Sequence, residues 1–219
     1  MKREIQNELE STLSRVGVAV GGEVLDGIAA YQPLLEAWSK RVRLVGSTDP
    51  RTVAIKHFAD SLTLVPLLSA MKPKEKMLDI GSGAGFPGIP LALARPDLCV
   101  TLVEADYRKA SFLLAAAASL KLENVQVVSA CLGGEPLDEG IQSFELVVSR
   151  ALMDVESWLE LGRHYLSPNG SLVAMMGSNA PDDGALRTLG LRAGLVLESV
   201  WRGELSGAGD RVTAKWRIA

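Results

Sequence analysis

The chain contains 219 residues with a formal net charge of −3, and 47% of its residues are hydrophobic. That length suffices for one substantial core with a smaller appended element, and the composition is ordinary for a globular protein. No apolar run approaches the length of a membrane span, and the opening MKREIQNELE lacks the apolar core of a secretion signal, so we expect a cytoplasmic protein that contacts no membrane. The net negative charge disfavours binding of nucleic acid over the whole protein surface but permits a local basic patch.

Apolar side chains recur at helical spacing through the first 70 residues. The spacing predicts one helix across Ile5 to Val16 and a second across Val24 to Trp38, with Pro33 as a kink or break. A third helix is predicted to begin at the cap Thr48-Asp49-Pro50. Residues 71–75 then form the expected linker.

Basic residues cluster between and along these helices. They are Lys40, Arg41, Arg43, Arg51 and Lys56. One interpretation is a solvated face with pairs at i,i+4 spacing, such as Lys56 with Asp60, which is the ordinary meaning of a charge run. The other is a patch that contacts phosphates beside a cofactor domain.

The stretch Met77 to Leu93, MLDIGSGAGFPGIPLAL, changes from a strand pattern to a helical one across a glycine-rich turn. Gly81, Gly83 and Gly85 allow a sharp turn and let a ligand lie directly on the peptide groups. Phe86 stands where a dinucleotide fingerprint has its third glycine, so a different nucleotide-like ligand is indicated. The alternative is a tight turn that binds nothing, although such turns rarely need three glycines.

Two acidic residues flank this turn and narrow the choice of ligand. Asp79 stands just before the glycines, and Glu104 ends the next predicted strand, Leu98 to Val103, where a carboxylate can accept from ribose hydroxyls. Asp79 could face a cationic aminoacyl group. A ribose and a cationic tail without a pyrophosphate are features of S-adenosylmethionine (SAM), so the pattern predicts a SAM-dependent enzyme.

From residue 76 onward, predicted strands and helices alternate at βαβ spacing, which indicates a parallel sheet covered on both faces. The further strands expected are 125–129, 144–149 and 171–176, and the helices are 107–120 and 155–165. Two last strands, 195–201 and 212–218, would form an antiparallel hairpin at the edge of the sheet.

The chain has two cysteines, Cys99 and Cys131. Their spacing matches neither a zinc site nor a disulfide framework. Each falls in or just after a predicted buried strand, so we expect inert core thiols and no metal site.

Several segments together resemble the ribosomal RNA small subunit methyltransferase G family, also called glucose-inhibited division protein B. They are LDIGSGAGFPGIPLALARP, KRVRLVGSTDP, KHFADSL, RKASFL, LKLENVQVV and the tripeptide Ser149-Arg150-Ala151. The resemblance covers residues 30–176. It implies a helical extension over residues 1–72 and, over residues 73–219, a class I SAM-dependent methyltransferase fold: a Rossmann-like, mostly parallel seven-stranded sheet with an antiparallel edge hairpin. Members of that family methylate N7 of one guanine in small-subunit rRNA.

The resemblance also implies a set of cofactor-binding residues. They would be Asp79, Gly81, Gly83, Gly85, Phe86, Glu104, Ala130 and Arg150. Glu104 would take the ribose, backbone near Ala130 would meet the adenine, and Arg150 would be the catalytic residue beside the methyl-transfer point. A structural ion pair is the other reading of Arg150. His57 matches a family position in KHFADSL, yet a packing histidine explains it equally well.

The implied partner is small-subunit rRNA or the assembling small ribosomal subunit, and a monomer is expected. The substrate-binding residues that would meet RNA phosphates are Lys40, Arg43, Arg51, Lys56, Arg108 and Lys109. Lys109 could equally be a solvated residue. Guanine N7 carries a free lone pair and no proton at neutral pH, so methyl transfer to it needs alignment and dry surroundings rather than a base.

The chain departs from the family pattern at several polar positions. Val45, Cys131, Gly133 and Met176 stand where family members usually carry Thr, Arg, an acid and Lys. These changes leave the glycine turn intact. They keep open two other readings: a SAM-dependent enzyme for another RNA or a small molecule, and a SAM-binding, ribosome-associated protein without catalysis.

Overall fold

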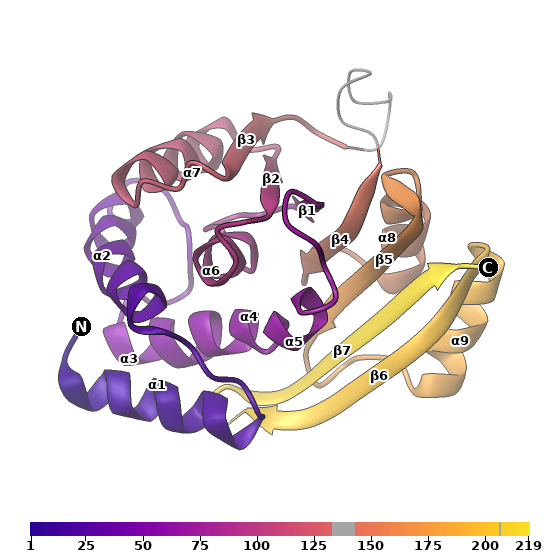
Figure 1. Cartoon of the computed structure of the whole chain (residues 1–219), viewed down its shortest axis with the longest axis horizontal. Coiled ribbons are helices and arrows are strands. Elements are labelled where there is room, and N and C mark those ends of the chain that lie inside the picture. Colours follow the sequence, from indigo (N-terminus) through magenta and orange to yellow (C-terminus); the bar gives the residue numbers. More distant parts are fainter. Residues whose placement is uncertain (133–142, 206) are drawn as a thin grey trace.

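The computed structural model describes residues 1–132, 143–205 and 207–219. Its centre is one seven-stranded sheet with the order β3-β2-β1-β4-β5-β7-β6 (Figure 1). The strands are β1 (Lys76–Ile80), β2 (Cys99–Glu104), β3 (Val125–Ser129), β4 (Phe144–Arg150), β5 (Leu166–Met176), β6 (Leu195–Leu205) and β7 (Gly209–Ile218). Strands β1 to β5 pair in parallel, whereas β7 pairs antiparallel with both β5 and β6. The predicted parallel sheet with an antiparallel edge hairpin is therefore confirmed.

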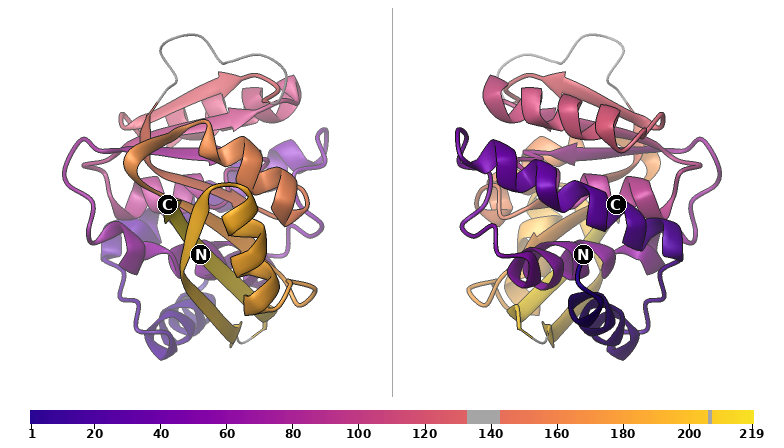
Figure 2. Two further views of the ribbon diagram at one scale, coloured as in Figure 1. Left: turned by 90° about the vertical axis from the view of Figure 1, so that its right-hand side faces the viewer. Right: turned by 90° about the vertical axis from the view of Figure 1, so that its left-hand side faces the viewer.

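Helices cover both faces of this sheet. They are α1 (Arg3–Arg15), α2 (Gly22–Ser39), α3 (Pro50–Val53), the π-helix η1 (Ala54–Ala59), α4 (Asp60–Leu62), α5 (Val65–Leu68), α6 (Gly88–Ala94), α7 (Tyr107–Ser119), α8 (Val155–Arg163) and α9 (Asp183–Arg192). Helices α8 and α9 pack on one side, while α6, α7 and the amino-terminal helices pack on the other (Figure 2). Within the described residues, no helix is long and apolar enough to cross a membrane.

Local sequence explains where several helices begin. Asp49, Asp106, Asp154 and Asp182 each accept a hydrogen bond from a backbone N–H in the first turn of the following helix. Such a cap is worth about 1 kcal/mol. The last of these, at α9, marks a helix that the sequence analysis did not predict.

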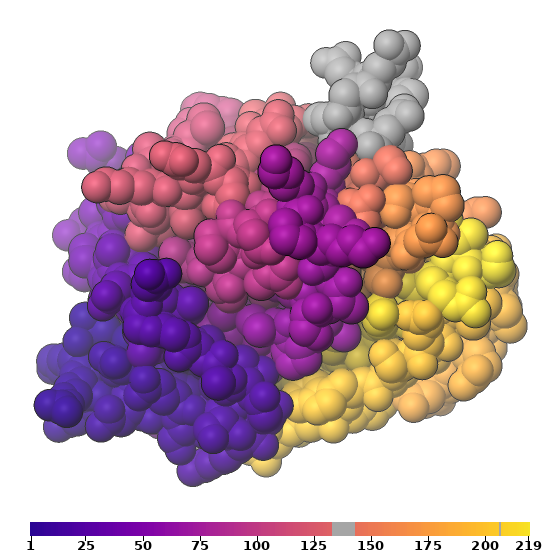
Figure 3. Space-filling model, viewed as in Figure 1, coloured from indigo at the N-terminus to yellow at the C-terminus, as the bar shows by residue number. Residues whose placement is uncertain are grey.

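The amino-terminal helices share a core with one face of the sheet. Leu9 of α1, Tyr31 of α2, Phe58 of η1 and Met77 of β1 belong to one buried cluster. In the space-filling view these helices lie directly against the rest of the molecule, down to the hairpin of β6 and β7 (Figure 3). The proposed division at residues 72 and 73 remains a prediction, and any boundary there would cut across this shared core.

Two local predictions need correction. Of the kink or break predicted at Pro33, the break is wrong, because α2 continues to Ser39 with the neighbouring Tyr31 and Leu35 fully buried against the core. The cysteines are not core thiols, since both are exposed. Cys99 is the first residue of β2, where the strand begins, and Cys131 follows β3, an edge strand whose side chains are only partly covered.

The third predicted helix is present but interrupted. Asp49 caps it as expected, and Pro50 is its first residue. The backbone then widens into η1 before it continues as α4. Because π-helical turns are rare and often lie at functional sites, the residues around Asp60 are candidates for a functional site.

Candidate functional site

In the glycine turn after β1, only one of the three glycines, Gly83, has free space where a side chain would stand. Gly81, Gly83 and Gly85 all have left-handed φ angles of 72°, 57° and 81°. A Cβ on Gly81 would lie 2.4 Å from the Leu152 side chain, and one on Gly85 would lie 2.5 Å from Ile89. A Cβ on Gly83 would have no neighbour closer than 3.8 Å. Packing therefore requires the outer glycines, whereas open space lies beside the Gly83 Cα.

Glu104, at the end of β2, holds this turn in place. One carboxylate oxygen accepts from the Gly83 N–H at 2.8 Å, and the other accepts from the Asp106 N–H at 2.9 Å. The residue is only 7% exposed. Each carboxylate oxygen has two lone pairs, so Glu104 can still accept from ligand hydroxyls. Ala130 lies alongside, where its N–H donates to the Glu104 carbonyl at 3.2 Å.

Asp79, in β1, is fully buried, and only one of its two carboxylate oxygens has a hydrogen-bond partner among the described residues. Its Oδ2 accepts from the Gly88 N–H at 2.9 Å, while Oδ1 has no hydrogen-bond partner among the described residues. Burial raises the pKa of Asp79 to about 7, although the Gly88 N–H and the Arg150 charge oppose this shift. An unpartnered carboxylate oxygen in such a place is costly unless a ligand supplies a donor. Asp79 therefore fits the cationic group that the sequence predicted for it.

Arg150, the last residue of β4, lies over the glycine turn and also forms an ion pair. Its guanidinium is 5.2 Å from the centre of the Phe86 ring. Its Nη1 is 3.3 Å from the Asp60 carboxylate, and its Nη2 is 3.1 Å from His57 Nδ1. The two readings of Arg150 are therefore compatible, because the ion pair holds the guanidinium at the edge of the expected cofactor site.

Asp60 connects three distant segments through its carboxylate. It lies at the start of α4, is 4% exposed, and accepts from both Arg150 of β4 and Arg211 of β7, the latter at 3.0 Å. Burial raises the pKa of Asp60, and the two arginines oppose that shift. The suggested surface pair with Lys56 was wrong, because Asp60 turns into the protein and Lys56 lies exposed on η1.

His57 lies inside the same cluster. Its ring stacks on Phe86 with centroids 5.0 Å apart. Because a guanidinium can only donate, the His57 Nδ1 facing Arg150 must be the acceptor, and the ring proton is on Nε2. Burial, followed by the charges of Arg150, Arg211 and Lys56, lowers the pKa of His57 to about 4, so the ring is neutral at physiological pH.

Tyr31 is a further residue that the sequence analysis did not select. Its hydroxyl donates to the carbonyl of Ala84 inside the glycine turn, and its ring meets Phe58, Phe86 and Phe112 edge to face. The apolar spacing of α2 showed only that this ring would be buried. No local signal pointed to its hydrogen bond, nor to Arg211 as a partner of Asp60.

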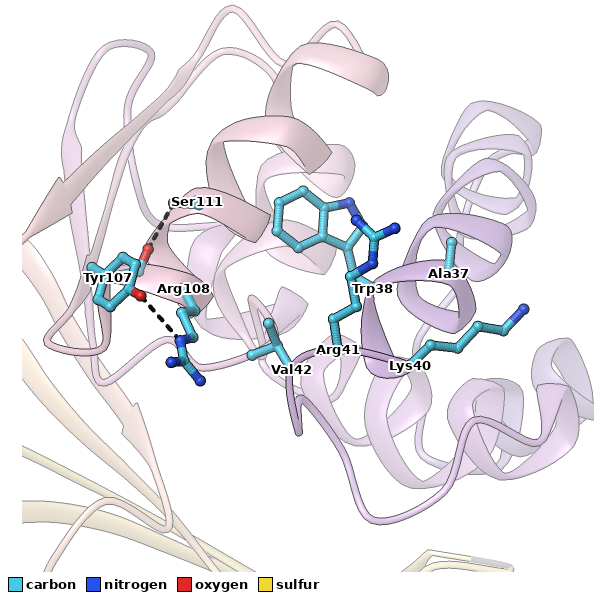
Figure 4. Close-up of a pocket in the computed structure, with 8 residues that line it drawn as sticks. All are labelled: Ala37, Trp38, Lys40, Arg41, Val42, Tyr107, Arg108 and Ser111. Carbon is cyan, nitrogen blue, oxygen red and sulfur yellow. Dashed lines mark hydrogen bonds between the residues drawn. The ribbon is translucent and has the colours of Figure 1, made fainter.

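The predicted substrate-binding cations do not all gather at one place. Lys40 and Arg108 line one cavity between the end of α2 and the start of α7 (Figure 4). Arg43 is exposed in the loop after α2, and Lys109 is half-buried on α7. Arg51 is held by Glu8 of α1, with its Nε 2.7 Å from the carboxylate.

A second cavity adjoins the end of β4. It has a volume of about 290 Å³ and includes Ala151, Met176 and Gly177 in its lining. Arg150 pairs with Met175 across β4 and β5, so this cavity lies at the same carboxyl edge as the Arg150 cluster. Of the family departures, Met176 therefore borders the candidate site, whereas Gly133 lies outside the described residues.

Sheet order, the glycine turn after β1 and the carboxylate after β2 together define a class I methyltransferase fold with a ligand site at the carboxyl edge of the sheet. A SAM dependent methyltransferase from Aquifex aeolicus has a similar structure, with a TM-score of 0.57 at 16% identity over 78% of this chain and 94% of that one. The family model of rRNA small subunit methyltransferase G matches residues 25–188. The chain belongs to this family, as the sequence resemblance indicated.

Curated relatives agree with that assignment. The ribosomal RNA small subunit methyltransferase G of Anaeromyxobacter sp. (strain Fw109-5) is 41% identical over 210 residues, which cover 95% of each chain. The protein of the same name from Myxococcus xanthus (strain DK1622) is 37% identical over 94% of each chain. Both alignments are longer than the range 30–176 on which the resemblance first rested.

Proposed function

We propose that this chain is a SAM-dependent methyltransferase that modifies N7 of a guanine in small-subunit rRNA. The observation that carries the proposal is the unpartnered Asp79 oxygen, buried beside a glycine turn that has open space at the Gly83 Cα. The names of the relatives support rRNA as the substrate class. The choice of guanine N7 follows from the family resemblance.

The residues present fit the cofactor. Asp79 would accept from its ammonium group, Glu104 would accept from its ribose, and the backbone of Gly83 and Ala130 would border it. Phe86, which follows the turn, is fixed by edge-to-face packing against Tyr31 and Phe58. When bound, SAM supplies a methyl group made electrophilic by the adjoining sulfonium.

The chain's own residues then have to align the base with the methyl group and limit the positive charge near the base. Because guanine N7 needs no deprotonation, the site needs no catalytic base, and the low pKa of His57 keeps its ring from adding positive charge beside Arg150. The base gains positive charge during transfer, so a bare cation nearby would raise the barrier. Asp60 pairs with Arg150 and so offsets that cost while it keeps the guanidinium in place. We place the target base at the edge formed by Arg150 and the cavity beside Met176.

The direct test measures transfer of a labelled methyl group from SAM to naked small-subunit rRNA, to assembled small subunits and to extracted small molecules. Nucleoside analysis should find the label as 7-methylguanosine in the rRNA. Label in small molecules, or in another nucleoside, would overturn the substrate assignment. SAM binding without any transfer would favour a non-catalytic protein.

The pKa of Asp79 predicts a pH dependence for cofactor binding. A cationic ammonium binds the ionised carboxylate, so SAM affinity should rise about tenfold per pH unit below about pH 7 and level off above it. Asp79→Asn should bind SAM weakly and without this slope, as measured by calorimetry between pH 5.5 and pH 7.5, where the α-amino group of free SAM stays largely protonated.

The raised pKa of Asp79 also affects the stability of the ligand-free protein, which should fall with rising pH. Because folding raises the pKa of Asp79 from its usual 3.8, its contribution to stability is full below pH 3.8 and is lost as the pH rises to about 7. The melting temperature of the parent should therefore fall relative to that of Asp79→Asn as the pH rises from 3.8 to about 7. A parent whose SAM affinity is flat below pH 7 would contradict the role given to Asp79.

A further inference from the structure

A cavity separates the end of α2 from the first turn of α7. Its volume of about 500 Å³ is large enough for one nucleotide. The lining residues are Ala37, Trp38, Lys40, Arg41, Val42, Tyr107, Arg108 and Ser111. Figure 4 shows that α2 and the following turn supply one wall and α7 supplies the other.

The charge in this cavity is of one sign. Its described lining contains the cations Lys40, Arg41 and Arg108 and no carboxylate. In the part of the chain that the structure describes, none of the three forms an ion pair. The nearby Asp106 carboxylate is engaged as the cap of α7, where it accepts from the N–H of Arg108. Three uncompensated cations around one hollow favour an anionic ligand such as a phosphate.

Aromatic rings in the same cavity point to a nucleotide rather than to phosphate alone. Tyr107 is 67% exposed, which is unusual for so large an apolar surface. Its hydroxyl accepts from Arg108 Nε at 3.1 Å, so the ring and the guanidinium are held together. Trp38 packs edge to face against Phe112, with ring centroids 5.8 Å apart. Of the two rings, Tyr107 is exposed and Trp38 is half-buried. Accessible rings beside cations are the usual platform on which unpaired bases stack.

The position of the cavity relates it to the methyl-transfer site. Helix α7 begins three residues after Glu104, whose carboxylate also accepts from the Asp106 N–H. The cavity thus borders the expected cofactor on the β2 side, whereas Arg150 ends β4. Strand β1 lies between β2 and β4, so the ends of these two strands are about 10 Å apart, and the cavity lies beyond β2 on the side away from β4. A base in the cavity is therefore not the base that is methylated.

We propose that this cavity binds one unpaired nucleotide of the rRNA near the target guanine, with its base against Tyr107 and Trp38 and its phosphate among Lys40, Arg41 and Arg108. This assignment rests on the proposed function for the identity of the RNA. The cavity would hold the strand in register, so that the target guanine reaches the site at Arg150.

Binding of a short single-stranded RNA, measured by fluorescence anisotropy over a range of salt concentrations, tests the proposal. Tyr107→Ala should weaken binding about tenfold, and Tyr107→Phe should restore it because the stacking face returns. Lys40→Gln and Arg41→Gln should each reduce the slope of log affinity against log salt by about 0.7. Arg187→Gln, an exposed cation on α9 at the other end of the sheet, should leave the slope unchanged.

Three further measurements separate this proposal from the proposed function. Melting temperature and SAM calorimetry should be unchanged in all these variants, since Tyr107, Lys40 and Arg41 are exposed. Photo-crosslinking of a 4-thiouridine RNA should label peptides that contain Tyr107 or Trp38. If the parent methylates rRNA but the cavity variants bind RNA like the parent, the cavity assignment fails and the function stands. If the parent binds RNA through this cavity yet methylates none, the function fails and the cavity stands. A parent that binds no RNA overturns the cavity assignment.

Discussion

Gly83→Val should abolish SAM binding while the protein stays folded, with affinity reduced by at least about a hundredfold. The valine side chain would extend into the one open space over the glycine turn, where no protein atom lies within 3.8 Å of the added Cβ. The left-handed φ of 57° adds strain of about 1–3 kcal/mol for a β-branched residue. Calorimetry with SAM and thermal unfolding together measure both effects.

Gly17→Val is a matched control for that experiment. Gly17 also has a left-handed φ, at 75°, and a Cβ there would meet nothing within 4 Å. It follows α1, far from the glycine turn. Both variants should lose similar stability, but only Gly83→Val should lose SAM. Equal SAM affinity in the two variants would remove Gly83 from the cofactor site.

Asp60→Asn should lower the free energy of unfolding by about 3 kcal/mol and strongly reduce methyl transfer. The substitution keeps the shape of the side chain but leaves the guanidinium groups of Arg150 and Arg211 without a countercharge in a largely buried place. Burial raises the pKa of Asp60 even beside two arginines, so desolvation of the carboxylate outweighs the attraction of the two guanidinium groups. The loss arises chiefly because uncompensated charge stays buried.

The Glu8–Arg51 pair supplies the comparison for Asp60. It also joins α1 to a later helix, but its side chains are 32% and 60% exposed. Glu8→Gln should therefore cost less than about 1 kcal/mol and leave methyl transfer intact. Denaturant unfolding of both variants, with turnover at saturating SAM, measures the contrast. If Asp60→Asn behaves like Glu8→Gln in both measurements, Asp60 does not position Arg150.

Local patterns were enough to predict the elements that form the candidate cofactor site. The strand, glycine turn and helix around Gly81, Gly83 and Gly85 lie within one continuous stretch, and Glu104 ends the next strand. Side-chain period and turn chemistry are properties of neighbouring residues, so they can be read before the fold is known. The same reasoning identified the antiparallel hairpin at the end of the chain.

Tertiary structure alone decided which distant residues meet. Asp60 and Arg150 are 90 positions apart, and Asp60 and Arg211 are 151 apart. The cavity between Lys40 and Tyr107, and the exposure of Cys99 and Cys131, likewise depend on how α2, α7 and the sheet edges are arranged. Periodicity reveals which face of an element is apolar but carries no information on the element that will cover it. Strand order and helix packing supply that information, and here they bring the charges of η1, α4, β4 and β7 to one edge of the sheet.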